Sequence, residues 1–145
     1  MKRQISKKIK KDHYHSSAAI VWCFDARFSG LLEKHISKKK LYFPDIIKIA
    51  GGAKALATPE NKNERDYILS QIEKSFKLHH PKEIYLMVHA NCGAYGKNFI
   101  DEKSEKKFYL AELEKAEKNL KNFLSRKKIE ARVVKCFADF EGISF

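Results

Sequence analysis

The sequence predicts an α/β domain built on a mainly parallel sheet of four to five strands flanked by helices. Short apolar runs alternate along the chain with segments whose apolar residues repeat at helical spacing. Strands too apolar to face water, separated by helices, are typical of a parallel sheet covered on both faces. The length of 145 residues fits one domain, and a hydrophobic content of 43% is enough for a core.

Four segments are predicted as strands. Residues 18–23, 45–50 and 83–89 are continuous apolar runs, as expected for strands buried on both faces. The second run ends at the pair Gly51-Gly52. Residues 130–137 alternate more between apolar and polar side chains, so this strand is predicted to lie nearer an edge of the sheet.

Three helices are predicted between these strands. Residues 63–79 carry an apolar stripe at helical spacing, with Glu64 in the first turn. Residues 104–124 carry a second stripe, and Ser104 is predicted to be its N-cap, without the acidic partner of a capping box. A shorter helix is predicted over residues 29–36.

The chain is strongly basic, with a formal net charge of +12 and a pI of about 9.6. Such a balance attracts anions, but lysines far outnumber arginines, which argues against nucleic-acid binding as the main function. Residues 1–17 are predicted to be a basic N-terminal tail, and residues 18–145 a single α/β domain. An arm that contacts a membrane surface or RNA is the alternative for the tail. Its basic residues are Lys2, Arg3, Lys7, Lys8, Lys10 and Lys11.

Cysteine usage predicts a reducing, cytoplasmic environment. The chain has three cysteines, Cys23, Cys92 and Cys136. An odd count without a signal sequence argues against a secreted disulfide framework. No apolar run approaches the roughly 20 residues needed to cross a bilayer, so no membrane association is expected.

Potential metal ligands follow two of the predicted strands. Cys23 ends the first strand, while His89 ends the third and lies three residues before Cys92. Because ligands bind at the carboxyl ends of parallel strands, these three side chains are expected to converge. Two sulfur donors and one nitrogen donor suit zinc and leave a fourth position open, as in catalytic zinc sites. One zinc ion per chain is therefore expected in the domain of residues 18–145.

A closed structural zinc site is the alternative to this open one. It would require a fourth Cys or His ligand. Cys136, His13 and His15 are available for that purpose. Cys136 lies on the fourth predicted strand, away from the other ligands, so we expect it to be a structural thiol.

Asp25 and Arg27 follow Cys23 closely. On an extended segment, side chains two positions apart point the same way, so the two can form a charge-assisted pair. In the functional interpretation, Arg27 holds Asp25 ionised and oriented beside the metal, and both are candidate catalytic residues. The alternative is a surface ion pair that contributes about 0–1 kcal/mol.

These motifs resemble those of the β-class carbonic anhydrases. That family carries Cys-x-Asp-x-Arg at one strand end and His-x-x-Cys-Gly at another, here residues 23–27 and 89–93. Residues 49–53 stand where the family has an Ala-Gly turn, and residues 138–142 resemble its last strand and turn. The similarity extends from about residue 18 to the C-terminus. Ala26 and Asn91 stand where the family commonly has Ser and Asp.

The resemblance implies zinc-dependent, reversible hydration of carbon dioxide to bicarbonate. It implies a zinc ion held by Cys23, His89 and Cys92, with an Asp–Arg pair beside it and self-association as a homodimer or higher assembly. In some members the Asp itself occupies the fourth zinc position. Related members hydrolyse carbon disulfide or carbonyl sulfide, which is the second expected function. A catalytically inactive zinc-binding homologue is the third.

Overall fold

A five-stranded sheet forms the centre of the structure, a computed structural model that describes residues 7–9 and 11–145. The strand order is β2-β1-β3-β4-β5; the first four strands are parallel and β5 is antiparallel to β4. The predicted α/β class is therefore confirmed. The strands are β1 (Ala18–Cys23), β2 (Asp45–Ile49), β3 (Glu83–His89), β4 (Arg132–Ala138) and β5 (Ile143–Ser144).

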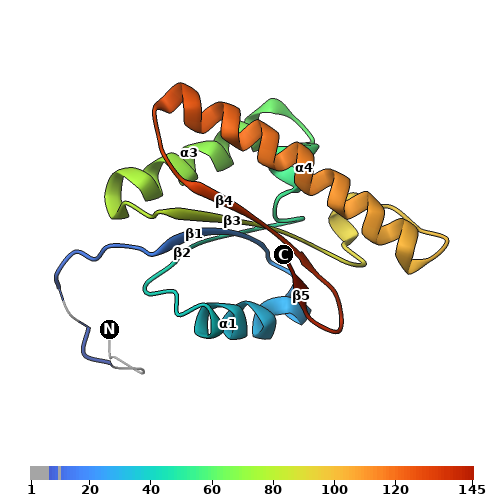
Figure 1. Ribbon diagram of the computed structural model, residues 1–145, viewed down its shortest axis with the longest axis horizontal. Helices are drawn as coiled ribbons and strands as arrows, with labels where there is room; N and C mark the ends of the chain where they lie inside the picture. The colour runs from blue at the N-terminus through green and yellow to red at the C-terminus, as the bar shows by residue number, and fades with distance from the viewer. Residues whose placement is uncertain (1–6, 10) are drawn as a thin grey trace, which may run out of the picture.

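Helices cover both faces of this sheet. The longer ones, α3 and α4, lie on one face together with α2, and α1 lies on the other (Figure 1). All of β1 and nearly all of β3 are buried, because both lie in the middle of the sheet. The helices are α1 (Ser29–Lys38), α2 (Lys54–Ala57), α3 (Lys62–His79) and α4 (Glu102–Lys127), with short 3-10 turns η1 (Ala26–Phe28) and η2 (Gly93–Tyr95).

The prediction that the second strand is buried on both faces is wrong. In β2, half-buried and exposed residues alternate, and Ile46 is 44% exposed. The physical reason is the place of β2 at the edge of the sheet, where it pairs with β1 alone among the described residues. An apolar run indicates a strand, but it does not tell a central strand from an edge strand.

The predicted start of the long helix is also wrong. The helix α4 begins at Glu102, and its N-cap is Asp101, whose carboxylate accepts a hydrogen bond from the Ser104 backbone N–H at 2.6 Å. The Ser104 hydroxyl in turn accepts from the Asp101 backbone N–H at 3.4 Å. A capping box is present with the acid at the cap and the hydroxyl at the third position, the reverse of the usual order.

Two short elements escaped the sequence analysis. The helix α2 spans four residues, too few to show a helical period. The strand β5 spans two residues and returns along β4 through a tight turn. The Asp139 carboxylate closes that turn by accepting hydrogen bonds from the backbone N–H groups of Glu141 and Gly142 at 3.0 and 2.9 Å.

The end of the predicted basic tail packs on the domain. Residues 1–6 and 10 of that tail lie outside the described residues. Tyr14 donates a hydrogen bond to Asp45 Oδ1 at 3.0 Å, and its ring stacks on His79 at 4.1 Å between centroids. These contacts tie residue 14 to β2 and α3. Within the described part of the chain, no helix is both long and apolar enough to cross a membrane.

Candidate metal centre

The structure brings together the three side chains predicted to bind metal. Cys23 is the last residue of β1, His89 is the last of β3, and Cys92 lies in the turn that follows. Because β1 and β3 are parallel neighbours, their carboxyl ends meet at the same edge of the sheet. The ligand atoms lie within 4.8 Å of one another, and all three residues are buried. This group could hold a metal ion.

The turn after β2 passes close beneath these strand ends. Gly52 has a φ of +57°, and a Cβ atom there would lie 2.4 Å from the Met87 carbonyl oxygen and 3.1 Å from the Cys23 backbone nitrogen. Only glycine fits so close an approach with a left-handed backbone. The next residue, Ala53, donates its N–H to the same Met87 oxygen at 2.8 Å. The turn is therefore hydrogen-bonded to β3 and packed against the end of β1, the two strands that carry His89 and Cys23.

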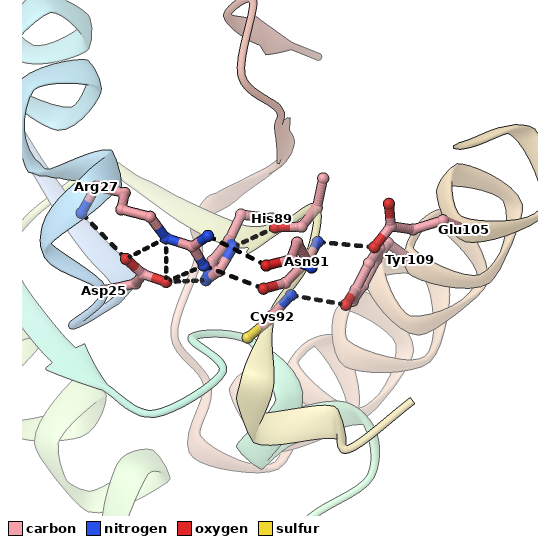
Figure 2. Close-up of polar contacts among 8 residues, drawn as sticks. Asp25, Arg27, His89, Asn91, Cys92, Glu105 and Tyr109 are labelled. Atoms are coloured by element: carbon pink, nitrogen blue, oxygen red, sulfur yellow. Dashed lines mark hydrogen bonds and ion pairs between the residues drawn. The ribbon is translucent and has the colours of Figure 1, made fainter. Parts of the chain in front are cut away.

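One hydrogen bond orients the imidazole of His89. Its Nδ1 atom lies 2.8 Å from the Ala90 carbonyl oxygen, to which it can only donate (Figure 2). The Nε2 atom then presents its lone pair, and this buried atom has no hydrogen-bond partner. A buried polar atom without a partner is costly, and a metal ion at Nε2 would satisfy it. The ring of Phe28 packs 4.3 Å from the imidazole and shields it.

The two thiols differ in their affinity for a proton. A hydrogen bond from Cys92 lowers the pKa of Cys23 well below its usual range, against the opposing effect of burial. The same interaction raises the pKa of Cys92, which keeps its proton beside the Cys23 thiolate. The thiolate is the form that binds metals. Two cysteine sulfurs and an imidazole nitrogen form a donor set that fits zinc, and binding would release the proton of Cys92.

The other candidate ligands lie elsewhere. Cys136 is fully buried in β4, and burial raises the pKa of its thiol to about 12. Neither Cys136 nor the histidines His13 and His15 belongs to the group that could hold a metal ion. A closed four-ligand site built from these residues is therefore absent from the described part of the chain.

Asp25 and Arg27 form the predicted ion pair, but a turn rather than an extended segment brings them together. The segment is not extended: Asp25 caps η1 and accepts the Arg27 backbone N–H at 3.0 Å. The guanidinium donates from Nε to both carboxylate oxygens at 3.0 and 3.1 Å, and from Nη2 to Oδ2 at 2.6 Å. These hydrogen bonds lower the pKa of Asp25 to about 2. Asp25 Oδ2 lies 3.9 Å from His89 Nε2, beside the group of potential ligands.

Three further residues contact the site in a way that the sequence did not predict. Arg27 also donates to the side-chain and backbone oxygens of Asn91, both at 3.1 Å. On the other side of that turn, Glu105 accepts the Asn91 backbone N–H at 2.7 Å, and the Tyr109 hydroxyl accepts that of Cys92 at 3.1 Å (Figure 2). No local pattern predicts contacts between positions 14 to 64 residues apart.

Comparison with solved structures identifies the class of fold. The chain is similar to the β-carbonic anhydrase isoform I of Trichomonas vaginalis, with 15% identity, a TM-score of 0.58, and coverage of 97% of this chain and 86% of that one. A carbonic anhydrase from Streptococcus mutans gives 17% identity, a TM-score of 0.56, and coverage of 91% and 82%. The apo form of a carbon disulfide hydrolase gives 15% identity, a TM-score of 0.55, and coverage of 90% and 79%. The fold is that of the β-carbonic anhydrases.

Family membership follows from the sequence itself. Residues 13–143 match the family described as "Putative carbonic anhydrase", and the chain belongs to that family. No curated protein matches the sequence. The predicted resemblance to carbonic anhydrases is thereby confirmed.

Proposed function

We propose that this chain binds one zinc ion through Cys23, His89 and Cys92 and catalyses the reversible hydration of carbon dioxide to bicarbonate. One observation carries the proposal above the others. Three buried sulfur and nitrogen donors, including an imidazole Nε2 without a partner, lie within 4.8 Å of one another beside an ionised carboxylate. Family membership and the fold support the same reaction.

Zinc at this position would lower the pKa of a bound water to about 7 and so make hydroxide available near neutral pH. The chain supplies the surroundings for that chemistry. The Cys23 thiolate is already favoured before any metal binds, because Cys92 donates to it. The aromatic ring of Phe28 covers His89, and Phe140 lies 5.6 Å from Phe28. These rings would give the site an apolar side, which suits a small apolar substrate such as carbon dioxide.

Asp25 and Arg27 are the proposed catalytic residues. Asp25 stays ionised throughout the neutral range, because the Arg27 guanidinium holds its pKa near 2. An ionised carboxylate is a hydrogen-bond acceptor only, so Asp25 orients the reacting water by accepting its proton in a hydrogen bond. Arg27 grips the carboxylate through both oxygens and keeps it from moving toward the ligands.

We propose further that the active assembly is a homodimer or larger, and that the protein works in the cytoplasm. The edge strand β2 has β1 as its sole strand partner among the described residues, and exposed apolar side chains lie beside it at Tyr42, Phe43 and Ile46. Exposed apolar surface next to an unpaired strand edge favours self-association. The other proposed partner is the substrate pair, carbon dioxide and bicarbonate.

Stopped-flow measurement of carbon dioxide hydration with a pH indicator tests the proposed reaction on zinc-loaded protein. The wild-type chain should accelerate hydration, and Cys23→Ser, which removes one proposed ligand, should not. Sulfide release from carbon disulfide or carbonyl sulfide is measured in parallel, because one structure of similar fold is a carbon disulfide hydrolase. Sulfide release without hydration would assign the hydrolase reaction instead. Full zinc content with neither activity would identify an inactive homologue.

A further inference from the structure

We propose that Asn91 is a positioning residue that holds the Arg27 guanidinium from its far side, and that Glu105 holds Asn91 in place. The α4 helix would thereby set the geometry of the Asp25–Arg27 pair. The inference rests on the proposed function, because it concerns the same site. It assigns to Asn91 and Glu105 a task that neither motif of the sequence indicates.

The Arg27 guanidinium is hydrogen-bonded on two sides. On one side its Nε and Nη2 atoms donate to the Asp25 carboxylate at 2.6 to 3.1 Å. On the other side Nη1 donates to Asn91 Oδ1, and Nη2 donates to the Asn91 carbonyl oxygen, both at 3.1 Å. A planar guanidinium fixed at both ends has a single orientation. With Asp25 alone as partner, the ion pair could rotate as a unit about the η1 turn.

Asn91 has a backbone conformation that lets it contact both α4 and Arg27. Its φ is +53°, in the left-handed region, which Asn tolerates better than most residues. This conformation places its backbone N–H toward α4 and its two oxygens toward Arg27 (Figure 2). One residue thus joins the helix on one side to the Asp25–Arg27 pair on the other.

Two side chains of α4 bind the backbone of the turn that contains Asn91. Glu105 and Tyr109 lie four residues apart and therefore on the same face of the helix. They accept the consecutive backbone N–H groups of Asn91 and Cys92 at 2.7 and 3.1 Å. Glu105 lies in the first turn of α4, where the helix dipole favours a negative charge. Because α4 is a long helix of 26 residues, these hydrogen bonds fix the position of the turn that contains Asn91 and Cys92.

The contacts of Asn91 affect the distance between Asp25 and the metal ligands. Asp25 Oδ2 already lies 3.9 Å from His89 Nε2. If Asn91 releases the guanidinium, the ion pair gains freedom to swing, and the carboxylate can approach the ligands. Asn91 therefore acts through Arg27 on the separation between Asp25 and the metal ligands.

The test begins with metal-free, ¹⁵N-labelled protein and needs no turnover. Rotation about the Arg27 Nε–Cζ bond is measured by NMR, and the five arginines of the chain keep the assignment simple. Asn91→Gly deletes the side-chain acceptor but retains a residue that tolerates positive φ, so rotation should accelerate severalfold. Asn91→Asp keeps an acceptor at the same place and should retain the slow rotation of the wild type.

Glu105 is tested with a matched control on the same helix. Glu105→Ala should also accelerate Arg27 rotation, and combining it with Asn91→Gly should add little, because both act through one contact. Glu102→Ala removes the same charge from α4 but breaks no hydrogen bond or ion pair of the described residues, so rotation should not change. Circular dichroism checks that each variant folds, and the Glu105 variant keeps the proposal testable if Asn91→Gly does not.

Kinetics on the zinc-loaded protein then separate positioning from general damage. Asn91→Gly should lower kcat by about tenfold to a hundredfold with KM nearly unchanged, as expected for a misplaced group near the reaction. Unchanged Arg27 rotation in both Asn91→Gly and Glu105→Ala would overturn the proposal. If the variants show accelerated Arg27 rotation but the wild type does not hydrate carbon dioxide, the positioning role is upheld and the proposed function is rejected. The failure of the inference and the failure of the proposed function are therefore distinguishable.

Discussion

The Oδ2 atom of Asp25 lies 3.9 Å from the Nε2 atom of His89, at the end of the imidazole that has no hydrogen-bond partner. The carboxylate is close enough to reach the metal-binding group with little backbone movement. Arg27 holds it back through hydrogen bonds to both oxygens. The proposed ligands and the residue that could compete for the open metal position are therefore neighbours, and several predictions depend on this arrangement.

The first prediction concerns zinc content. Protein purified without added metal should contain one zinc ion per chain by elemental analysis. Cys23→Ser and His89→Ala should lose most of it, because three-ligand sites hold zinc poorly after one donor is removed. Cys136→Ala should keep full content, since Cys136 lies outside the group. Zinc loss in the Cys136 variant would count against the ligand assignment.

A second prediction concerns Arg27. Arg27→Ala should abolish turnover while zinc stays bound, because the released Asp25 carboxylate becomes the nearest anionic ligand for the open position. A crystal structure of the zinc-loaded variant should show a carboxylate oxygen on the metal. Asp25→Asn should also keep zinc, with a smaller loss of turnover. Wild-type turnover in Arg27→Ala would show that the pair only supports the fold.

The same ion pair predicts a change of stability in acid. Hydrogen bonds from Arg27 lower the pKa of Asp25 from 3.8 to about 2 in the folded protein. A lowered folded-state pKa contributes stability that is fully present above about pH 4 and is lost as the pH falls toward 2. Urea unfolding of metal-free wild type and Asp25→Asn should therefore show a difference in free energy that shrinks over this range. A constant difference would mean that the pair adds nothing to folding.

Two glycines should respond in opposite directions to substitution by alanine. Gly52→Ala should destabilise the protein by more than the roughly 1–3 kcal/mol of backbone strain, because the new Cβ would also lie 2.4 Å from the Met87 oxygen. Gly30→Ala should stabilise it by up to about 0.5 kcal/mol, less than in the middle of a helix, since Gly30 lies in the first turn of α1 with open space around it. Denaturant unfolding measures both changes. Equal stability of the two variants would contradict the close approach beneath the ligands.

The last prediction is self-association. Sedimentation at micromolar concentration should show at least a homodimer. Ile46→Lys places a charge on the exposed side of the edge strand β2 and should shift the equilibrium toward monomer. Leu110→Lys, at an equally exposed apolar residue of α4, serves as the control. A wild-type chain that sediments as a monomer would contradict the proposed assembly.

Much of the fold could be predicted because hydrophobic patterning is a local property. Apolar runs predicted the strands β1, β2 and β3, and a more alternating segment predicted β4. The potential ligands lie at or just after the ends of β1 and β3: Cys23 at the first, and His89 with Cys92 at the second. Parallel strands bring their carboxyl ends together whatever the details of packing. The sequence alone therefore determined the class of fold and the three side chains that converge.

Only the tertiary structure decided how these parts are held. The sheet order placed β2 at an edge, although its apolar run resembles that of a central strand. The 3-10 turn, rather than an extended segment, paired Asp25 with Arg27. The links from Arg27 to Asn91 and from Asn91 to Glu105 join positions 64 and 14 residues apart. Such contacts depend on strand order and on how α4 packs against the sheet, and neither can be predicted from the periodicity of the sequence.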